Sequence, residues 1–423
     1  MTAGTRIDDG RLAHASFYDD PALQRVLACL NDKGEETRIA GGAVRNALFG
    51  LPVRDVDLAT TALPDEVIRR AKTAGCKTVP TGIEHGTITV ISGGTPFEVT
   101  TLREDVETNG RHAVVRFGRD FAQDAMRRDF TINALFADKD RRIHDYVGGL
   151  DDIAKHKVRF IGDAGQRIAE DYLRILRLFR IHAAYGHGPV DRDGLLASIA
   201  GRKGMLGLSK ERIGAELQKL LEAPGAAAAI GEMADAGLLG TLLGGVPLTA
   251  RFVNLVATED AQERSPDTTL RLTALAALVP EDAERLQDML RLSNLQAVRI
   301  AQAIRAFLTI RDIKVPPYKT DLYRFLFQIG RTAAIDALLL AQAHAAPGST
   351  DAKWRQALAF LRDTPEPRLP FTGSDLIKHG VKTGPAMGAM LKRLQVAWIR
   401  AGFPKEPEVL SRLLQQALQE SNA

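Results

Sequence analysis

Strand-forming runs in this chain are confined to about its first 120 residues, and the rest of the sequence is helical. Past that point apolar residues recur at helical spacing, as in 168–184 and 213–221, and Pro and Gly breaks separate Ala- and Leu-rich segments. We therefore predict an α+β fold, a mixed sheet with helices followed by an all-α region. The expected strands, rich in β-branched residues, are 37–40, 55–59, 76–80, 86–91 and 97–101, with helices over 43–49 and from Pro64.

Length and composition exclude several classes of protein. A chain of 423 residues is too long for one core and predicts two to four domains. No apolar run approaches the ~20 residues of a membrane span, and the N-terminus lacks the apolar stretch of a secretory signal. Cys29 and Cys76 cannot build a disulfide framework or a thiolate zinc site, so we expect a cytoplasmic protein. The net charge of +4 is compatible with a nucleic-acid partner without requiring one.

Asp55 and Asp57 form the first chemically informative pair. If residues 55–59 are a strand, both side chains leave the same face, where two carboxylates repel unless a cation lies between them. Mg²⁺ prefers such oxygen ligands, and a pair of metal ions activates a hydroxyl and neutralises pyrophosphate. Alone, however, Asp-x-Asp is more often a solvated strand end. Glu98, on a later strand, is either a third acid at this site or an exposed polar residue.

Gly41-Gly42 precedes this pair and stands between an expected strand and an expected helix. Backbone N–H groups at such a turn can approach a phosphate, and Arg45 adds a charge one turn into the helix. A Gly-Gly pair by itself indicates only a tight turn, and no Gly-Lys-Ser/Thr follows that would make it a Walker A loop. A glycine turn followed by two acids is more specific, and it predicts a triphosphate seat beside metal ligands.

Asp171, Arg174, Arg177 and Arg180 are spaced three apart and form a ridge if one helix carries them all. A solvated ladder of ion pairs is the plain interpretation of this spacing. The arginines have few nearby acids, however, which favours a positive stripe for a triphosphate or an RNA backbone.

Asp171 and Arg174 also permit a selection between bases. Cytosine and adenine present an amino donor beside a ring-nitrogen acceptor, whereas guanine and uracil present a carbonyl beside an N–H. A carboxylate and a guanidinium accept the first pattern and leave unpaired groups against the second. Each unpaired buried group costs about 1–3 kcal/mol, which is enough for rejection.

The order of motifs resembles the class II tRNA nucleotidyltransferases of the DNA polymerase β superfamily. The resemblance is specific over about residues 37–222 and weaker through 290–294 and 372–385. Gly41–Arg45 with Asp55–Asp57 is similar to motif A, and four more segments follow in the family's order. These are 127–134 (motif B, ribose selection), 145–152 (motif C, a hinge), 170–177 (motif D, the amino-acid template for the base) and 209–217 (motif E, a buttress).

This resemblance implies a polymerase-β-like nucleotidyltransferase head at 1–145, then a helical neck (146–223), body (224–362) and tail (363–423). It implies addition of C, C and A to the tRNA acceptor arm from CTP and ATP, with two Mg²⁺ ions and release of pyrophosphate, and without an obligate protein partner. The implied metal ligands and catalytic residues are Asp55 and Asp57. Glu98 joins them as a candidate catalytic residue from its place on the later strand and not from the resemblance. The implied nucleotide-binding residues are Gly42, Arg45, Arg128, Asp171, Arg174, Arg177 and Arg180.

One residue departs from the pattern, because Asn46 stands where the family usually carries Asp. We expect an altered orientation of Arg45 rather than lost catalysis. No His-Asp pair occurs in the helical half, so the chain is expected to lack the phosphohydrolase domain that some relatives append.

Full CCA addition, partial CC or A addition, and poly(A) addition share this scaffold. The segment 101–117 resembles the flexible loop of complete CCA-adding enzymes, although an exposed hairpin has the same pattern. On the resemblance of this segment we favour full CCA addition. The absence of the long basic extensions typical of the poly(A) enzymes is a secondary point in the same direction. A non-catalytic RNA- or nucleotide-binding relative is the remaining alternative, and the retained aspartate pair argues against it. Basic clusters that would follow tRNA phosphates are 141–142, 155–159, 202–203, 378–382 and 392–393.

Overall fold

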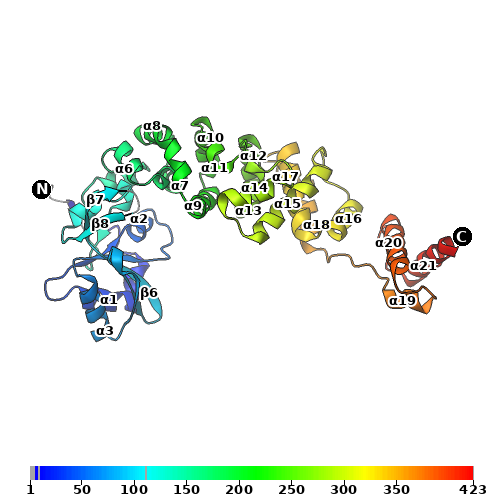
Figure 1. Cartoon of the computed structure of the whole chain (residues 1–423), viewed down its shortest axis with the longest axis horizontal. Helices are drawn as coiled ribbons and strands as arrows, with labels where there is room; N and C mark the ends of the chain where they lie inside the picture. The colour runs from blue at the N-terminus through cyan, green and yellow to red at the C-terminus, as the bar shows by residue number, and fades with distance from the viewer. Residues whose placement is uncertain (1–4, 8–9, 110–111, 423) are drawn as a thin grey trace. The chain divides into compact units, whose positions relative to one another are not determined.

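The structure is a computed structural model that describes residues 5–7, 10–109 and 112–422. It divides into two compact units, residues 1–242 and 243–423. Strands occur in the first unit, in the blue-to-cyan part of Figure 1, and the described part of the second unit is built from helices. The predicted α+β class is therefore confirmed. None of the helices in the described ranges is both long and apolar enough to cross a bilayer.

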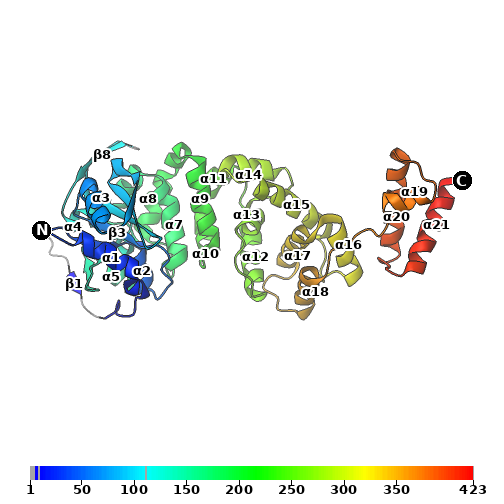
Figure 2. The same ribbon diagram turned by 90° about the horizontal axis from the view of Figure 1, so that it is seen from below.

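An eight-stranded mixed sheet forms the centre of the first unit, in the order β1-β10-β9-β2-β3-β6-β5-β4. Helices α1 (Pro21–Leu30) and α3 (Pro64–Thr73) pack together against one face of it (Figure 2). All five predicted strands exist, but β1, β9 and β10 were not predicted, because runs of two or three residues carry no detectable alternation. The strands are β1 Thr5–Ile7, β2 Thr37–Ala40, β3 Asp57–Thr60, β4 Lys77–Gly82, β5 Thr87–Ser92, β6 Thr95–Thr101, β9 Phe136–Ala137 and β10 Ile143–Asp145.

The segment after β6 is a hairpin. β7 (Arg103–Asn109) pairs antiparallel with β8 (His112–Phe117), and residues 110 and 111 lie outside the described ranges. The hairpin interpretation of this segment is confirmed as far as its backbone is described. Its resemblance to the loop of complete CCA-adding enzymes stays a prediction.

Buried apolar residues hold the sheet to the segment that follows it. Phe136 on β9 packs edge-on against Phe121, which begins α4 (Phe121–Met126), with ring centroids 5.2 Å apart. Both belong to a buried cluster that includes Ala40 at the end of β2 and Ala59 on β3. Burying one large side chain contributes about 1.5–3 kcal/mol, so this cluster fixes the ends of the strands that carry the candidate site.

Helices make up the remainder of the first unit. The 3-10 helix η3 (Thr131–Asn133) follows α4, and α7 (Leu173–Tyr185) packs against α9 (Lys210–Glu222) and α10 (Ala226–Asp235). The others are α2 Gly42–Leu48, α5 Gly149–Ala154, α6 Ala164–Glu170, α8 Arg192–Gly201 and α11 Leu239–Leu243.

Apolar contacts also organise the second unit. Its C-terminal helices share a buried cluster that includes Trp398 and Phe403, against which Tyr323 and Phe327 of α16 pack. The helices are α12 Thr249–Ala261, α13 Thr268–Ala276, α14 Asp282–Leu290, α15 Asn294–Ile310, α16 Lys319–Ile329, α17 Arg331–Ala345, α18 Ala352–Asp363, α19 Gly373–Lys378, α20 Pro385–Arg400 and α21 Pro407–Asn422.

Candidate active site

One pocket of the first unit brings together nine of the ten site residues predicted from the sequence. It has a volume of about 580 Å³ and is lined mainly by the ends of β2, β3 and β6, by the segment after α4 and by α7. Asp55 is the predicted residue that does not line it. The nine are Gly42, Arg45, Asp57, Glu98, Arg128, Asp171, Arg174, Arg177 and Arg180.

Two acids enter this pocket from neighbouring strands. β3 and β6 are parallel, with Leu58 beside Val99, so Asp57 and Glu98 immediately precede a paired position. Partial desolvation raises the pKa of Asp57, the charge of Glu98 raises it further, and the nearby Arg128 opposes both. The carboxylates therefore lie close enough to repel one another.

The prediction that a single strand carries both aspartates is wrong. β3 begins at Asp57, which pairs with Ala40, the last residue of β2. At Gly41, with a φ of 64°, the chain turns away from the β2–β3 pairing. Because the two strands are antiparallel, the residues before Asp57 then have no β2 residue to pair with. Asp55 is exposed in the preceding loop, although its charge also contributes to the raised pKa of Asp57.

The oxygen donors around Asp57 fit a divalent cation. Within the described ranges, no three His, Cys, Asp or Glu side chains are arranged to hold a metal ion on their own. A small hard cation is commonly bound by one or two carboxylates and completed by substrate phosphates and water. Asp57 and Glu98, with Asp55 nearby, supply crowded carboxylates whose repulsion such an ion would relieve.

The turn at Gly41 brings the backbone against the next wall of the pocket. A Cβ at this position would lie 3.0 Å from Nη1 of Arg128 and 3.3 Å from the carbonyl oxygen of Asn133. The positive φ and this close approach both require glycine. Arg128 is itself held by Asp124, at 3.1 Å, so the turn and this guanidinium are fixed together.

Asp171 lies between two helices rather than on the helix of the arginines. α6 ends at Glu170, Asp171 has extended backbone (φ −157°, ψ 106°), and α7 begins at Leu173. Its carboxylate accepts the Leu173 N–H at 3.1 Å and pairs with Arg212 at 2.6 Å. The predicted continuous helix over 168–184, and the ridge starting at Asp171, are wrong at this point because the side chain bonds backbone that a helix would otherwise use.

The expected positive stripe with few compensating acids is also wrong. The three arginines of α7 all line the pocket, but each forms an ion pair with an acid that lies outside α7. Sequence spacing along α7 does not reveal partners 36 and 48 residues away. The pairs are Arg174 with Glu170, Arg177 with Asp129 at 2.5 Å, and Arg180 with Glu216 at 2.5 Å.

The site also contains polar residues that we did not select from the sequence, and three of them hold or join its other side chains. Asp129 and Asn133 line the pocket, and Arg212 holds Asp171. All three stand inside the segments that resemble motifs B and E. Their place inside these motifs was the one sequence feature that could have identified them. The motif pattern alone did not show which residue of each motif faces the pocket.

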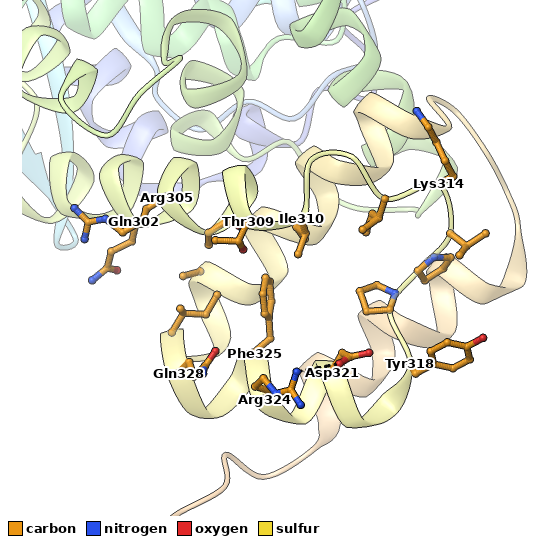
Figure 3. Close-up of a pocket in the computed structure, with 17 residues that line it drawn as sticks. Gln302, Arg305, Thr309, Ile310, Lys314, Tyr318, Asp321, Arg324, Phe325 and Gln328 are labelled. Carbon is orange, nitrogen blue, oxygen red and sulfur yellow. Dashed lines mark hydrogen bonds and ion pairs between the residues drawn. The ribbon is translucent and has the colours of Figure 1, made fainter. Parts of the chain in front are cut away.

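A larger pocket, in the second unit, lacks the features of a two-acid site. It has a volume of about 930 Å³ and lies between α15 and α16 (Figure 3). Asp321 is the acid among the residues that line it, and this side chain is paired with Arg324 at 3.4 Å. The smaller pocket of the first unit therefore carries the chemistry.

Comparison with known proteins agrees with this assignment. Residues 37–159 match the family described as the poly A polymerase head domain, and residues 263–414 match one described as tRNA nucleotidyltransferase domain 2, putative. A CCA tRNA nucleotidyltransferase 1, mitochondrial, from Mus musculus is 35% identical over 92% of this chain and 88% of its own length. The CCA-adding enzyme of Lacticaseibacillus paracasei is 32% identical over 91% of this chain and 92% of its own.

A solved structure leads to the same family. The CCA-adding enzyme of Bacillus stearothermophilus in complex with CTP superposes with a TM-score of 0.72 at 27% identity, covering 96% of this chain and all of that one. With full-length relatives at more than 30% identity, the protein belongs to the family of CCA tRNA nucleotidyltransferases, the CCA-adding enzymes.

Proposed function

We propose that this enzyme adds C, C and A to the 3′ end of tRNA, using CTP and ATP and releasing pyrophosphate without a nucleic-acid template. The observation that carries the proposal is one pocket in which Asp57 and Glu98 face the arginines of α7. Acids that hold a cation and arginines that hold an anion are the two requirements of nucleotidyl transfer.

We assign the catalytic end of the pocket to the strand acids. Asp55 and Asp57 are the proposed metal ligands, with Glu98 beside them, and Mg²⁺ is the ion that such oxygen donors suit. When bound, the ion would supply charge neutralisation and a lowered pKa for the attacking hydroxyl. Gly42, Arg45 and Arg128 bind the triphosphate and orient it for attack by the 3′-hydroxyl of tRNA.

The opposite end selects the base. Asp171 accepts from the amino group of cytosine or adenine, and Arg174 donates to the ring nitrogen. Arg212 leaves acceptor positions open on the Asp171 carboxylate, which offers about four. Arg174 is held by Glu170, so selection uses a guanidinium whose position is already fixed. Arg177 and Arg180 complete this wall of the nucleotide site.

We propose four parts for the chain, a head (1–145), neck (146–223), body (224–362) and tail (363–423). The buried cluster around Trp398 supports a compact tail. Lys392, Arg393 and Arg400 of α20 line a hollow of about 740 Å³ against α21, and we assign this basic surface to tRNA phosphates. Cys29 and Cys76 are both free thiols, which suits the reducing cytoplasm.

Incubating the protein with a tRNA lacking its 3′ end, CTP and ATP, and then sizing the product, tests the function. Three added nucleotides are expected. Two would indicate a partial enzyme, a long ladder a poly(A) polymerase, and no extension at all a non-catalytic RNA-binding relative.

A further inference from the structure

Arg45 differs from the other arginines predicted to bind nucleotide in how it is held. Arg128, Arg174, Arg177 and Arg180 each form an ion pair with a carboxylate. Within the described residues, the hydrogen bonds of the Arg45 guanidinium all end on neutral oxygen atoms, those of Asn46, Asn133 and Tyr185. Among the residues that the structure describes, no acid is bonded to this guanidinium.

Asn46 is oriented to accept these bonds. Its Nδ2 donates to the carbonyl oxygen of Pro52 at 3.2 Å, which leaves Oδ1 facing Arg45. Oδ1 then accepts from Nη2 of Arg45 at 2.9 Å, from Nε at 3.2 Å and from the Tyr185 hydroxyl at 3.0 Å. A neutral amide thus holds the guanidinium from the adjacent position on α2.

Tyr185, the last residue of α7, holds the same guanidinium from the other side. Its hydroxyl accepts a hydrogen bond from Nη2 of Arg45 at 2.7 Å, and its ring lies 4.0 Å from the guanidinium carbon. Phe49 stacks on this ring with centroids 5.4 Å apart. A cation–π contact attracts a cation without neutralising it.

We propose that Asn46 and Tyr185 form a charge-neutral clamp that positions Arg45 for the triphosphate of the incoming nucleotide. The proposal rests on the proposed function and adds two positioning residues to it. Burial lowers the pKa of Arg45 and the like charge of Arg180 lowers it further, whereas Tyr185 and Asp129 raise it. The bonds that a triphosphate would meet at Arg45 are therefore bonds to neutral groups. The clamp also links the C-terminal end of α7, which is the end farther from Asp171 and Arg174, to the proposed phosphate seat. Because it acts on the triphosphate and not on the base, we expect it to serve CTP and ATP equally.

Tyr185 takes the place that an acid occupies at the other arginines. A carboxylate at position 46 would hold Arg45 by itself, because an ionised acceptor bonds a guanidinium about twice as strongly as a neutral one. The Tyr185 hydroxyl then becomes dispensable. This relation predicts that the effect of removing the hydroxyl depends on the residue at position 46.

The test is a double-mutant cycle read by binding and by kinetics. The dissociation constants of CTP and ATP are measured by calorimetry without tRNA, and KM and kcat with a tRNA lacking its 3′ end. Tyr185→Phe is expected to raise Kd and KM for both nucleotides about 3- to 10-fold, as loss of one hydrogen bond does, with a smaller change in kcat. In the Asn46→Asp background, Tyr185→Phe is expected to raise Kd and KM for both nucleotides by less than about 2-fold.

Tyr18→Phe is the matched control. The Tyr18 hydroxyl donates to the buried carbonyl of Asp138 at 2.8 Å in the same unit, away from the pocket. The Tyr18→Phe variant is expected to lower the unfolding temperature without changing the Kd of CTP or of ATP. Unchanged nucleotide binding in Tyr185→Phe, or an equal loss in both backgrounds, overturns the clamp. Failure of the natural protein to extend tRNA would instead overturn the proposed function, and the calorimetric cycle would still decide the clamp.

Discussion

Asp129 accepts two hydrogen bonds from Arg177, from Nε at 2.8 Å and from Nη2 at 2.5 Å. Its other oxygen accepts from Nδ2 of Asn133 at 3.1 Å, and Asn133 in turn accepts from Arg45. One buried carboxylate thus joins the base-selecting helix to the phosphate seat. Burial alone would raise the pKa of Asp129, but Arg177 and these hydrogen bonds bring it below its usual range.

Asp129→Asn should therefore destabilise the first unit. Removing the charge leaves Arg177 without its ion-pair partner, and we expect a loss of about 1–3 kcal/mol in the free energy of unfolding. Because folding lowers the pKa, this contribution is present above the ordinary aspartate value of about 3.9 and is lost as the pH falls through the folded value. Urea unfolding between pH 3 and pH 7 measures it. A stability difference that does not shrink at the acid end would contradict the assignment.

Asp55→Ala and Asp57→Ala should each abolish nucleotide incorporation while tRNA binding persists. The expected loss in kcat is on the order of 10³-fold or more, because no other group replaces the cation-binding oxygens. Asp65→Ala, an exposed acid at the start of α3, is the control and should keep full activity. Near-normal turnover in Asp57→Ala would remove the metal assignment.

Arg174→Ala should weaken the choice of C and A over G and U, or lose activity, because the donor to the ring nitrogen is gone. Incorporation of each of the four nucleotides measures this. Arg69→Ala removes an exposed, ion-paired arginine of α3 and should leave selectivity unchanged. Selectivity that is also unchanged in Arg174→Ala would reject the template role.

Deleting residues 104–112 should leave CC addition and stop the final A. The deletion removes most of β7 and the start of β8, the hairpin that directly follows β6. CC addition in the same reaction serves as the internal control for folding. Undiminished incorporation of ATP would remove the basis for choosing full CCA addition.

Replacing Lys392, Arg393 and Arg400 together by Gln should weaken tRNA binding without changing the Kd of CTP. Each lost phosphate contact also lowers the salt slope of log K by about 1. Lys353→Gln with Arg355→Gln on α18 removes exposed charges elsewhere in the same unit and is the control. An unchanged salt slope in the triple variant would place the tRNA contacts on another surface.

The sequence by itself determined the fold class, the strands long enough to alternate, and nine of the residues that line the pocket. These follow from local rules, since β-branched runs, glycine turns and helical spacing act over a few residues. Nine of the ten residues chosen from these rules and from the family resemblance meet in one pocket. The tertiary structure alone decided the start of β3, because β2 leaves the ladder at Gly41, and the place of Asp171 outside the helix.

Tertiary structure also decided which charges are compensated. Arg177 and Arg180 are paired with acids far along the chain, whereas Arg45 is held by the neutral side chains of Asn46, Asn133 and Tyr185. Partners separated by tens of residues meet only when the chain folds, and nothing in local spacing encodes their distance. For that reason the sequence located the arginines, and only the folded protein showed which of them are bonded to acids and which to neutral groups.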